Sequence, residues 1–484
     1  MKNKVVVWLH MHQPEYFDPK SGIQYLPWVR RHLLKGYYTV VNLLEKYPAK
    51  ININFSGILI KQILRYANGE KDYYDYIESK DAGSLTESEA NFIINKFLVN
   101  VNGFSHEGFL ELIEKKSRRE KFTKDDLRDA QFLFTLSSFS KLNSNAWQLA
   151  GKKRHFTEKD KEDLKKIEKE TIKSVLPQYK KLYIENRIEL TITPMYHPIL
   201  PLLIDTNAAK ESKPDSLLPM SRFTHPEDAT LQIQESIAIF EKVFGKKPNG
   251  MWPSEGSVSN EAVELIEKSG IEWIGTDETV LKKSKSNVSK SLICSKEKLK
   301  ILFRNHALSD KIAFVYNKMN PRDAVKDFST YVETSEKIEV VILDGENPWE
   351  YYENGGIDFL SEWFKILEKI GLKGSEVEPR GTISNIVPGS WINGYFDTWI
   401  GHRESNNAWE YLTNAREKLS GNSNAMKEIY IAEGSDWFWW YSDFHKNEVD
   451  FSFDYLFRTH IIKAYELAGE IVPGYLFYPI KEAK

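Results

Sequence analysis

The stretch "IEVVILDGENPWEYY" (residues 338–352) joins a buried-strand pattern to a group of acids and aromatic residues. Its first part is almost continuously apolar, as expected for a parallel strand that is covered on both faces. It ends at Asp344 and Glu346, on either side of one glycine. Taken alone, Asp-Gly-Glu is typical of a solvated turn, so its meaning depends on how the other strands end.

Six more stretches show an apolar run with a polar end: "KVVVWLH" (4–10), "ININFS" (51–56), "IELTIT" (188–193), "GMWPSEG" (250–256), "IEWIGTD" (271–277) and "IAFVY" (312–316). Helical patterns separate them, for example residues 225–245, which begin at Pro-Glu-Asp and end at Gly245, and residues 259–270. This alternation predicts an α/β fold with a parallel sheet, and seven strands favour a barrel over an open sheet.

Two regions interrupt the alternation. Residues 57–187 are mostly helical and charged, which is typical of a solvated insertion. Residues after about 355 have helical patterns joined by aromatic-rich loops. We therefore predict a catalytic barrel over 1–355 that includes the helical insertion, and a C-terminal helical domain over 356–484 that contributes aromatic loops to the active site.

Composition excludes several classes of protein. The formal net charge of −3 over 484 residues gives no basic field for nucleic acid. The single cysteine, Cys294, excludes an intrachain disulfide framework and a cysteine-rich zinc site. The first apolar run stops at His10, too early for a signal peptide or a membrane span. We expect a soluble, cytoplasmic protein with no membrane partner.

Aromatic residues are abundant: 13 Trp, 24 Tyr and 26 Phe. They are suited to stacking on the apolar faces of sugar rings, and equally to filling a large core, so the count leaves both uses open.

The barrel prediction gives the strand ends their meaning, because active sites of such barrels lie at the carboxyl ends of the strands. The first strand ends with His10 and His12, which alternate and so point to one face. The fourth ends with Glu255 beside Trp252, and the seventh ends with Asp344. Two carboxyls that converge on an aromatic pocket are what glycoside hydrolysis requires. We expect burial and the nearby Glu346 to raise the pKa of Asp344.

The two histidines leave an alternative open. A His-x-His at the end of a first barrel strand also begins metal-dependent amidohydrolases, in which the metal activates water. That design needs further ligands, for which His197 and His306 are available. The acids at the fourth and seventh strands favour the carbohydrate hypothesis, in which the histidines contact sugar hydroxyls or orient a carboxylate. We therefore expect no metal and no other cofactor.

Several motifs together resemble glycoside hydrolase family 57, and within it the α-amylase and amylopullulanase branch. They are "HQP" (12–14), "IELTITPMYHPILPLL" (188–203), "WPSEGSVS" (252–259), "DGENPWEYY" (344–352), "GSWINGYFDTWIGH" (389–402) and "AEGSDWFWWYSDFH" (432–445). The resemblance implies an incomplete (β/α)7 barrel followed by a helical domain, and a retaining, metal-free reaction on α-glucans such as starch or glycogen.

The resemblance also implies site residues. Glu255 would be the nucleophile and Asp344 the general acid/base. The sugar site would be lined by His12, Glu189, Trp252, Glu346 and Trp399. Further substrate-binding candidates are His10, His197, Arg304, His306, Asp310, Trp391, Asp397, Asp436 and Trp437.

The same residues fit more than one activity. Hydrolysis of α-1,4 bonds, with α-1,6 bonds left open, is the leading hypothesis. A 4-α-glucanotransferase or a glucan branching enzyme would use the same covalent intermediate with a sugar as acceptor. A non-catalytic glucan-binding protein would need neither Glu255 nor Asp344.

Overall fold

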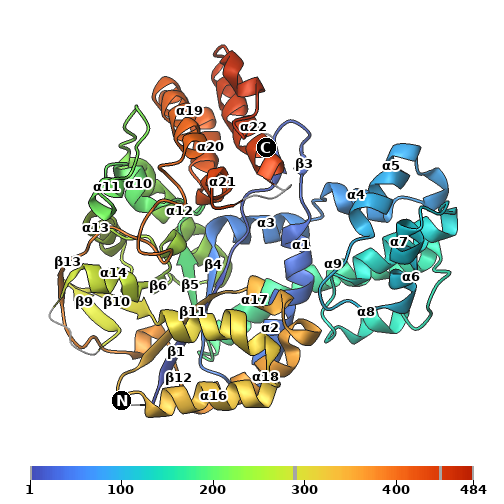
Figure 1. The fold of residues 1–484 in the computed structure, drawn as a ribbon, viewed down its shortest axis with the longest axis horizontal. Coiled ribbons are helices and arrows are strands. Elements are labelled where there is room, and N and C mark those ends of the chain that lie inside the picture. Colours follow the sequence, from blue (N-terminus) through green and yellow to red (C-terminus); the bar gives the residue numbers. More distant parts are fainter. Residues whose placement is uncertain (1–2, 287–290, 446–449, 482–484) are drawn as a thin grey trace.

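The computed structural model describes residues 3–286, 291–445 and 450–481, and its centre is one curled sheet (Figure 1). The strand order is β11-β1-β4-β5-β6-β7-β10-β9. The pairs from β11 to β10 are parallel, and β9 pairs antiparallel with β10. The bounds are β1 Val5–Met11, β4 Asn52–Ser56, β5 Glu189–Thr193, β6 Gly250–Met251, β7 Trp273–Asp277, β9 Ile293–Lys296, β10 Leu299–Arg304 and β11 Glu339–Asp344.

The seven parallel strands do not close into a complete barrel. Among the described residues, no strand ladder joins β10 to β11. Single bonds bridge this side: Arg304 Nε donates to the carbonyl of Ile342 at 2.9 Å, and the backbone N–H of Asn305 donates to that of Val340 at 2.7 Å. The expected incomplete (β/α)7 barrel is confirmed.

Tryptophans fill the interior of the barrel. The ring of Trp8 lies 4.5 Å from that of Trp273 and 5.6 Å from that of Trp252, measured between centroids. A Cβ at Gly250 would lie 2.3 Å from the Trp273 ring, and one at Gly275 would lie 2.5 Å from Trp8. Glycine at these two positions therefore gives the indoles their space.

One predicted strand, residues 312–316, is not a strand in the structure. Residues 311–315 form a single π-helical turn, followed by a 3-10 turn over 316–318. Ile312 is buried there, but Phe314 and Val315 are exposed, so the apolar run does not face the core. The sixth parallel strand is β10, in which the charged Lys300 interrupts the apolar pattern. The Lys300 ammonium donates to the carbonyls of Gly374 and Ser375.

Helices cover the outside of the barrel, and their ends follow ordinary capping chemistry. In α12 Pro226 occupies the first turn, and Gly245 ends the helix with φ +83°. In α13 the Ser259 hydroxyl accepts from the N–H of Ala262. The covering helices are α1 Trp28–His32, α2 Tyr38–Lys46, α3 Gly57–Ala67, α10 Leu200–Ile204, α11 Ala208–Ser212, α12 Pro226–Phe244, α13 Asn260–Lys268, α14 Glu278–Lys283, α15 His306–Asp310, α16 Pro321–Thr334, α17 Asn347–Glu350 and α18 Ile357–Ile370.

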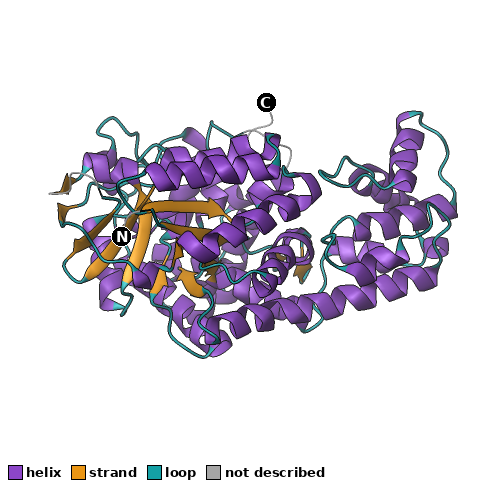
Figure 2. Ribbon diagram, turned by 90° about the horizontal axis from the view of Figure 1, so that it is seen from below, coloured by secondary structure: helices purple, strands orange, loops and turns teal. Residues whose placement is uncertain are grey.

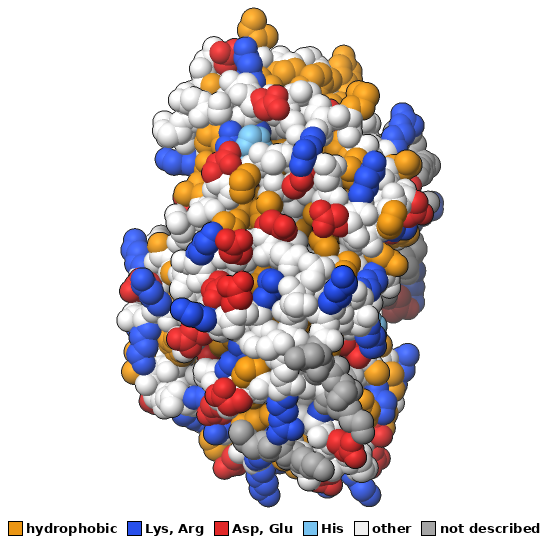
Figure 3. All heavy atoms as spheres, turned by 90° about the vertical axis from the view of Figure 1, so that its left-hand side faces the viewer, with side chains coloured by type: hydrophobic (Ala, Val, Ile, Leu, Met, Phe, Trp, Pro, Cys, Tyr) orange, Lys and Arg blue, Asp and Glu red, His pale blue; other side chains and the backbone are white. Residues whose placement is uncertain are grey.

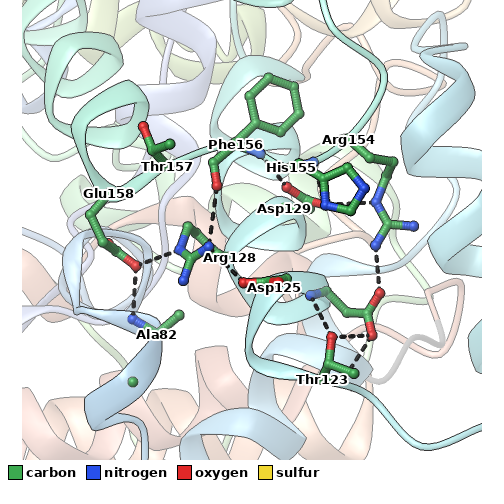
Figure 4. Close-up of polar contacts among 12 residues, drawn as sticks. Ala82, Thr123, Asp125, Arg128, Asp129, Arg154, His155, Phe156, Thr157 and Glu158 are labelled. Atoms are coloured by element: carbon green, nitrogen blue, oxygen red, sulfur yellow. Dashed lines mark hydrogen bonds and ion pairs between the residues drawn. The ribbon is translucent and has the colours of Figure 1, made fainter.

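Most of the predicted insertion forms a lobe of helices beside the strand-bearing body (Figure 2). Its helices are α4 Tyr73–Ser79, α5 Glu87–Phe92, α6 Glu107–Ser117, α7 Lys124–Leu136, α8 Ser144–Leu149 and α9 Glu158–Ile184. Polar bonds join these helices (Figure 4): Glu158 Oε1 accepts from the N–H of Ala82 and from Arg128 Nε, while Asp129 accepts from Arg154. The insertion therefore has internal structure of its own.

A buried ion cluster attaches the lobe to the barrel. Arg30 on α1 contacts Asp72 at 2.7 Å, Glu78 at 2.9 Å and Glu168 at 3.3 Å. Its side chain is 1% exposed. Asp72 caps α4 and Glu168 lies on α9, so one guanidinium holds two lobe helices against a barrel helix.

The C-terminal helical domain begins later than predicted. After residue 355, α18 packs on α2 and α16, and β12 (Gly371–Leu372) pairs with β1, so these elements belong to the barrel. The boundary at 355 is therefore too early. The helical domain consists of α19 Arg403–Leu419, α20 Ser423–Ala432, α21 Ser435–Tyr441 and α22 Asp450–Ala468. It docks on α12, where Arg416 Nε contacts Asp228 at 2.6 Å.

The molecular surface carries charges of both signs. On the face drawn in Figure 3, basic and acidic side chains of the described residues are interspersed, in keeping with a formal net charge of −3. None of the described helices combines the length and the apolar character that crossing a membrane requires.

We predict that Arg30→Ala lowers the free energy of unfolding by about 3–5 kcal/mol, because buried carboxylates lose their counter-charge. The measurement is urea unfolding followed by fluorescence, with limited proteolysis of the lobe. The control is Arg118→Ala, whose partner Glu114 and guanidinium are both more than half exposed, and which should change stability by less than about 1 kcal/mol. Equal effects of the two substitutions would contradict the anchoring role of Arg30.

Candidate active site

A cavity of about 550 Å³ lies at the carboxyl ends of the barrel strands. It brings together many residues that the sequence predicted, from strands far apart in the chain. These are His10, His12, Glu255, Arg304, His306, Asp310, Asp344, Glu346, Trp391 and Asp436. The wall opposite the strands comes from α21 and α22 of the helical domain, with Trp439, Trp440 and Phe453.

Glu255 lies in a 3-10 turn that follows β6. Its backbone adopts a left-handed conformation with φ +58°, which is uncommon for a non-glycine residue and clusters at functional sites. Trp391 holds both ends of the residue: its backbone N–H donates to the Glu255 carbonyl at 3.0 Å, and its indole N–H donates to Oε2 at 2.7 Å. Burial, followed by repulsion from Asp344, raises the pKa of Glu255 to about 8.

Asp344 is the last residue of β11. Asn347 donates to its Oδ2 at 3.1 Å. Burial raises the pKa of Asp344 even though the Asn347 bond and the charge of Arg304 act in the opposite direction. The expected direction of this shift agrees with the structure, and burial rather than Glu346 is its cause.

Glu346 is buried beneath the end of β1. Its Oε1 accepts from the backbone N–H of His12 at 2.8 Å and from the hydroxyl of Tyr37. Burial raises the pKa of Glu346 well above its usual range. This carboxyl therefore positions the strand carrying the histidines through its hydrogen bonds.

A chain of hydrogen bonds runs from β4 through two histidines to the helical domain. His10 Nδ1 donates to Asn54 Oδ1 at 2.6 Å, and burial lowers the pKa of His10 to about 3, so its Nε2 is an acceptor. His197 Nε2, 3.1 Å away, is then the donor to His10. Burial also lowers the pKa of His197 well below its usual range, so its Nδ1 accepts from Ser435 Oγ at 2.8 Å. Each link fixes the tautomer of the next ring.

His12 makes a second contact with the helical domain. Its Nε2 lies 3.0 Å from both carboxylate oxygens of Asp436, in the first turn of α21, and its Nδ1 lies 2.7 Å from Ser56 Oγ. The ring stacks on His197 with 3.7 Å between centroids and 12° between planes. α21 therefore joins the barrel at the site itself.

Arg304, the last residue of β10, lines the cavity and makes several polar contacts there. Its guanidinium contacts Asp310 at 2.7 Å and Asp277 at 3.4 Å, and lies 3.2 Å from His306 Nδ1. It also lies 5.5 Å from the ring of Trp391, a cation–π distance. Fixed donors and acceptors of this kind suit the hydroxyl rim of a sugar.

The geometry of the histidines argues against a metal site. The ligand atoms of His12, His197 and Asp436 lie within 4.8 Å of one another. Zinc, however, binds a ring nitrogen at about 2.0–2.1 Å, along the lone pair in the plane of the ring. Two nearly parallel rings 3.7 Å apart hold these lone pairs in separate planes, and the facing nitrogens already have protein partners.

Glu189 does not reach the cavity, contrary to the prediction. It is the first residue of β5, so it lies at the opposite end of the strand from the site. Five residues of strand span about 15 Å. Its carboxylate accepts from Trp273 Nε1 at 3.0 Å and from Ser375, which gives it a structural role in the barrel floor.

Three predicted tryptophans are buried rather than available as sugar platforms. Trp252 packs between Trp8 and Trp391 behind the cavity wall. Trp399 is 0% exposed and lies behind Trp439, and the indole of Trp437 donates to a carbonyl inside the helical domain. The platform prediction for Trp399 is therefore wrong.

Two other predicted residues also lie outside the cavity lining. Asp397 pairs with Lys213 at 2.8 Å, away from the strand ends. His197 lies behind His10 and His12, and its Nδ1 is 3.9 Å from Glu255 Oε1.

Sequence reasoning missed Trp439, Trp440, Phe453, Phe314 and Tyr351. A helical signal for the first two was present: Asp436 shares a helix face with residues three and four positions later, which are Trp439 and Trp440 rather than Trp437. Phe314 was assigned to a strand. Tyr351 lies in the quoted stretch 338–352 but was not predicted as a site residue, and no local pattern marked Phe453.

The family described as glycosyl hydrolase family 57 matches residues 6–388. No curated protein matches the chain significantly in sequence.

Solved structures of similar fold include a GH57 branching enzyme from Thermococcus kodakaraensis, with 14% identity, a TM-score of 0.61, and 96% of this chain and 90% of that chain covered. The α-amylase AmyC from Thermotoga maritima has 13% identity and a TM-score of 0.55, with 97% and 93% covered. The 4-α-glucanotransferase from Thermococcus litoralis has 16% identity and a TM-score of 0.55, with 96% and 60% covered. At these identities the likeness shows the fold.

We predict that the histidine cluster retains no zinc, because the stacked rings cannot both direct a lone pair at one ion. The protein is incubated with excess zinc, desalted and assayed by elemental analysis, and should carry well below one ion per chain. One zinc per chain in the wild type that disappears in Asp436→Asn would contradict this.

Proposed function

This chain belongs to glycosyl hydrolase family 57, and we propose that it cleaves α-glucosidic bonds in starch- or glycogen-type α-glucans with retention of configuration. As a member of this family it is an enzyme. The linkage, the stereochemical course and the roles of individual residues are the proposal. We also propose that the protein is cytoplasmic, as expected from the sequence.

One observation supports the proposal above the others. Glu255 and Asp344 reach the same cavity from strand ends 89 residues apart in the chain (344 − 255), and they repel one another enough to raise the pKa of Glu255. Two interacting carboxyls with raised pKa values are the constellation that glycoside hydrolysis uses.

The reaction follows from assigning different tasks to the two carboxyls. Glu255 attacks the anomeric carbon and forms an ester bond, while Asp344 gives its proton to the departing glycosidic oxygen. Ionised Asp344 then takes a proton from water, whose oxygen bonds to the anomeric carbon as the ester bond to Glu255 breaks. Two inversions return the α configuration.

The raised pKa of Glu255 adds a condition. With a pKa of about 8, Glu255 holds the proton near neutral pH when the cavity is empty. A nucleophile must be ionised, so the proton moves to Asp344 as the sugar binds. Positive charge that develops at the anomeric carbon stabilises ionised Glu255, and the indole N–H of Trp391 stabilises it further.

A transferase is the second candidate. The covalent intermediate is the same, and a sugar hydroxyl replaces water in the second step. The aromatic wall of Trp439, Trp440 and Phe453 favours this candidate because apolar side chains exclude water from the cavity. Product analysis separates the two.

We predict that Glu255→Gln and Asp344→Asn each lower activity by about 100- to 10,000-fold, because each removes one half of the pair. Activity is measured on maltoheptaose, with circular dichroism to verify folding. The control is Glu114→Gln, whose carboxylate is 59% exposed on a lobe helix and should leave activity unchanged. Full activity in either site variant would refute the assignment.

Products of the wild-type enzyme test the reaction class. Shorter sugars alone from maltoheptaose indicate hydrolysis, and longer ones indicate transfer. Parallel incubation with pullulan tests α-1,6 bonds. Proton NMR during the first turnovers should show the α anomer, and an initial β anomer would contradict retention.

We predict an alkaline limb of kcat/KM with its midpoint near pH 8, where the shared proton leaves the empty site. Trp391→Phe removes a donor that stabilises the ionised form, so the pKa of Glu255 rises and the limb moves up by about 0.5–1 pH unit. The measurement is kcat/KM for maltoheptaose from pH 4 to about 10. A limb that moves down in Trp391→Phe would show that Glu255 is not the group that titrates.

A further inference from the structure

Two aromatic side chains stand exposed on the rim of the cavity, next to Asp344. Phe314 is 67% exposed and Tyr351 is 66% exposed, and both line the cavity. Exposed apolar groups that lie together beside a cleft mark binding surfaces. We call Phe314 and Tyr351 the aromatic rim.

Local structure holds both rings outward. Phe314 lies in the π-helical turn between Ile312 and Tyr316, which are 0% and 1% exposed. Tyr351 follows α17 and precedes Tyr352, which is 5% exposed. The Tyr352 hydroxyl donates to the carbonyl of Ile312 at 2.5 Å, so the two segments are tied together. The buried neighbours therefore fix the rim as one surface.

The rim differs from the other aromatic walls of the cavity. Trp391 packs against Trp252 at 5.2 Å, and Trp439 stacks on His445 at 4.1 Å. Within the part of the chain that the structure describes, neither Phe314 nor Tyr351 has an aromatic partner. Their ring faces are open to a ligand.

Position relative to the two carboxyls indicates which part of the substrate the rim contacts. Phe314 follows β10 and Tyr351 follows β11, the strand that ends at Asp344. Glu255 follows β6, which is separated from β11 by β1, β4 and β5 in the strand order, whereas β10 faces β11 across the open side of the barrel. The sugar that becomes bound to Glu255 lies over the nucleophile, and the leaving group lies on the side of the acid. The rim is on that side.

We propose that the aromatic rim is a platform for the glucosyl units of the leaving group, and of the sugar acceptor in transfer. This rests on the proposed function. The apolar C–H faces of an α-glucan stack on the two rings, while Arg304 and Asp310, which line the same cavity, contact its hydroxyls. A chain held there presents a hydroxyl to the glycosyl–enzyme ester.

Both half-reactions balance with the groups present. In cleavage, the leaving sugar departs from the rim with the proton of Asp344. In transfer, the acceptor hydroxyl oxygen bonds to the anomeric carbon, the ester bond to Glu255 breaks, and the hydroxyl proton passes to Asp344. Occupation of the rim by sugar therefore competes with attack by water.

The test compares two substrates that differ in the leaving group. Maltoheptaose fills the rim with glucosyl units, whereas α-maltosyl fluoride leaves it empty. In Phe314→Ala and Tyr351→Ala we expect kcat/KM for maltoheptaose to fall about tenfold, chiefly through KM, as the sugar face loses its apolar cover. For hydrolysis of α-maltosyl fluoride we expect less than a twofold change. With added maltose as acceptor, the maltose concentration for half-maximal transfer should rise.

Matched controls are Phe477→Ala and Tyr478→Ala, exposed by 61% and 72% and absent from the cavity lining; neither should affect any of these values. Equal losses on both substrates in the rim variants, or no loss on maltoheptaose, would overturn the proposal. If the wild-type protein turned over neither substrate, the proposed function itself would be overturned. That outcome differs from the two outcomes that would overturn the role of the aromatic rim.

Discussion

The hydrogen bonds that His10 and His12 make with their neighbours join the barrel to the helical domain at the candidate active site. One chain of bonds runs from Asn54 through His10 and His197 to Ser435, and a second contact joins His12 to Asp436. The first members belong to barrel strands and the last to α21. The same contacts that dock the helical domain on the barrel therefore complete the wall of the cavity.

Burial in this arrangement shifts the pKa values of several groups toward their neutral forms. His10 and His197 are neutral because burial disfavours their cationic forms, and burial also raises the pKa of Glu346 well above its usual range. In the proposed mechanism Glu255 and Asp344 exchange one proton, and the charge of Asp344 raises the pKa of Glu255. In a partly dry cavity, moving that one proton changes the local electrostatics more than it would in water. The single remaining fixed cation, Arg304, is balanced by Asp310 and Asp277 among the described residues.

Most of the strands and helices were predictable because buried residues form a recognisable apolar pattern in the sequence. The first strand, all seven residues of which are buried, has five consecutive apolar residues before His10. The rule failed where periodicity and burial separate. Residues 312–316 are apolar, but Ala313 and Phe314 line the cavity. The strand β10, in contrast, carries Lys300, whose ammonium donates to backbone carbonyls. The boundary at 355 failed because β12 is two residues long, too short to leave a pattern.

For the site, the sequence by itself determined which strand ends carry acids: Glu255 and Asp344 follow apolar runs, and parallel strands bring their carboxyl ends to one edge. Only the tertiary structure decided which other side chains face the cavity. Glu189 is excluded by the direction of its strand, and Trp399 by the helices that cover it. Phe314 and Tyr351 face the cavity because their neighbours are buried, a long-range packing property that no local pattern records.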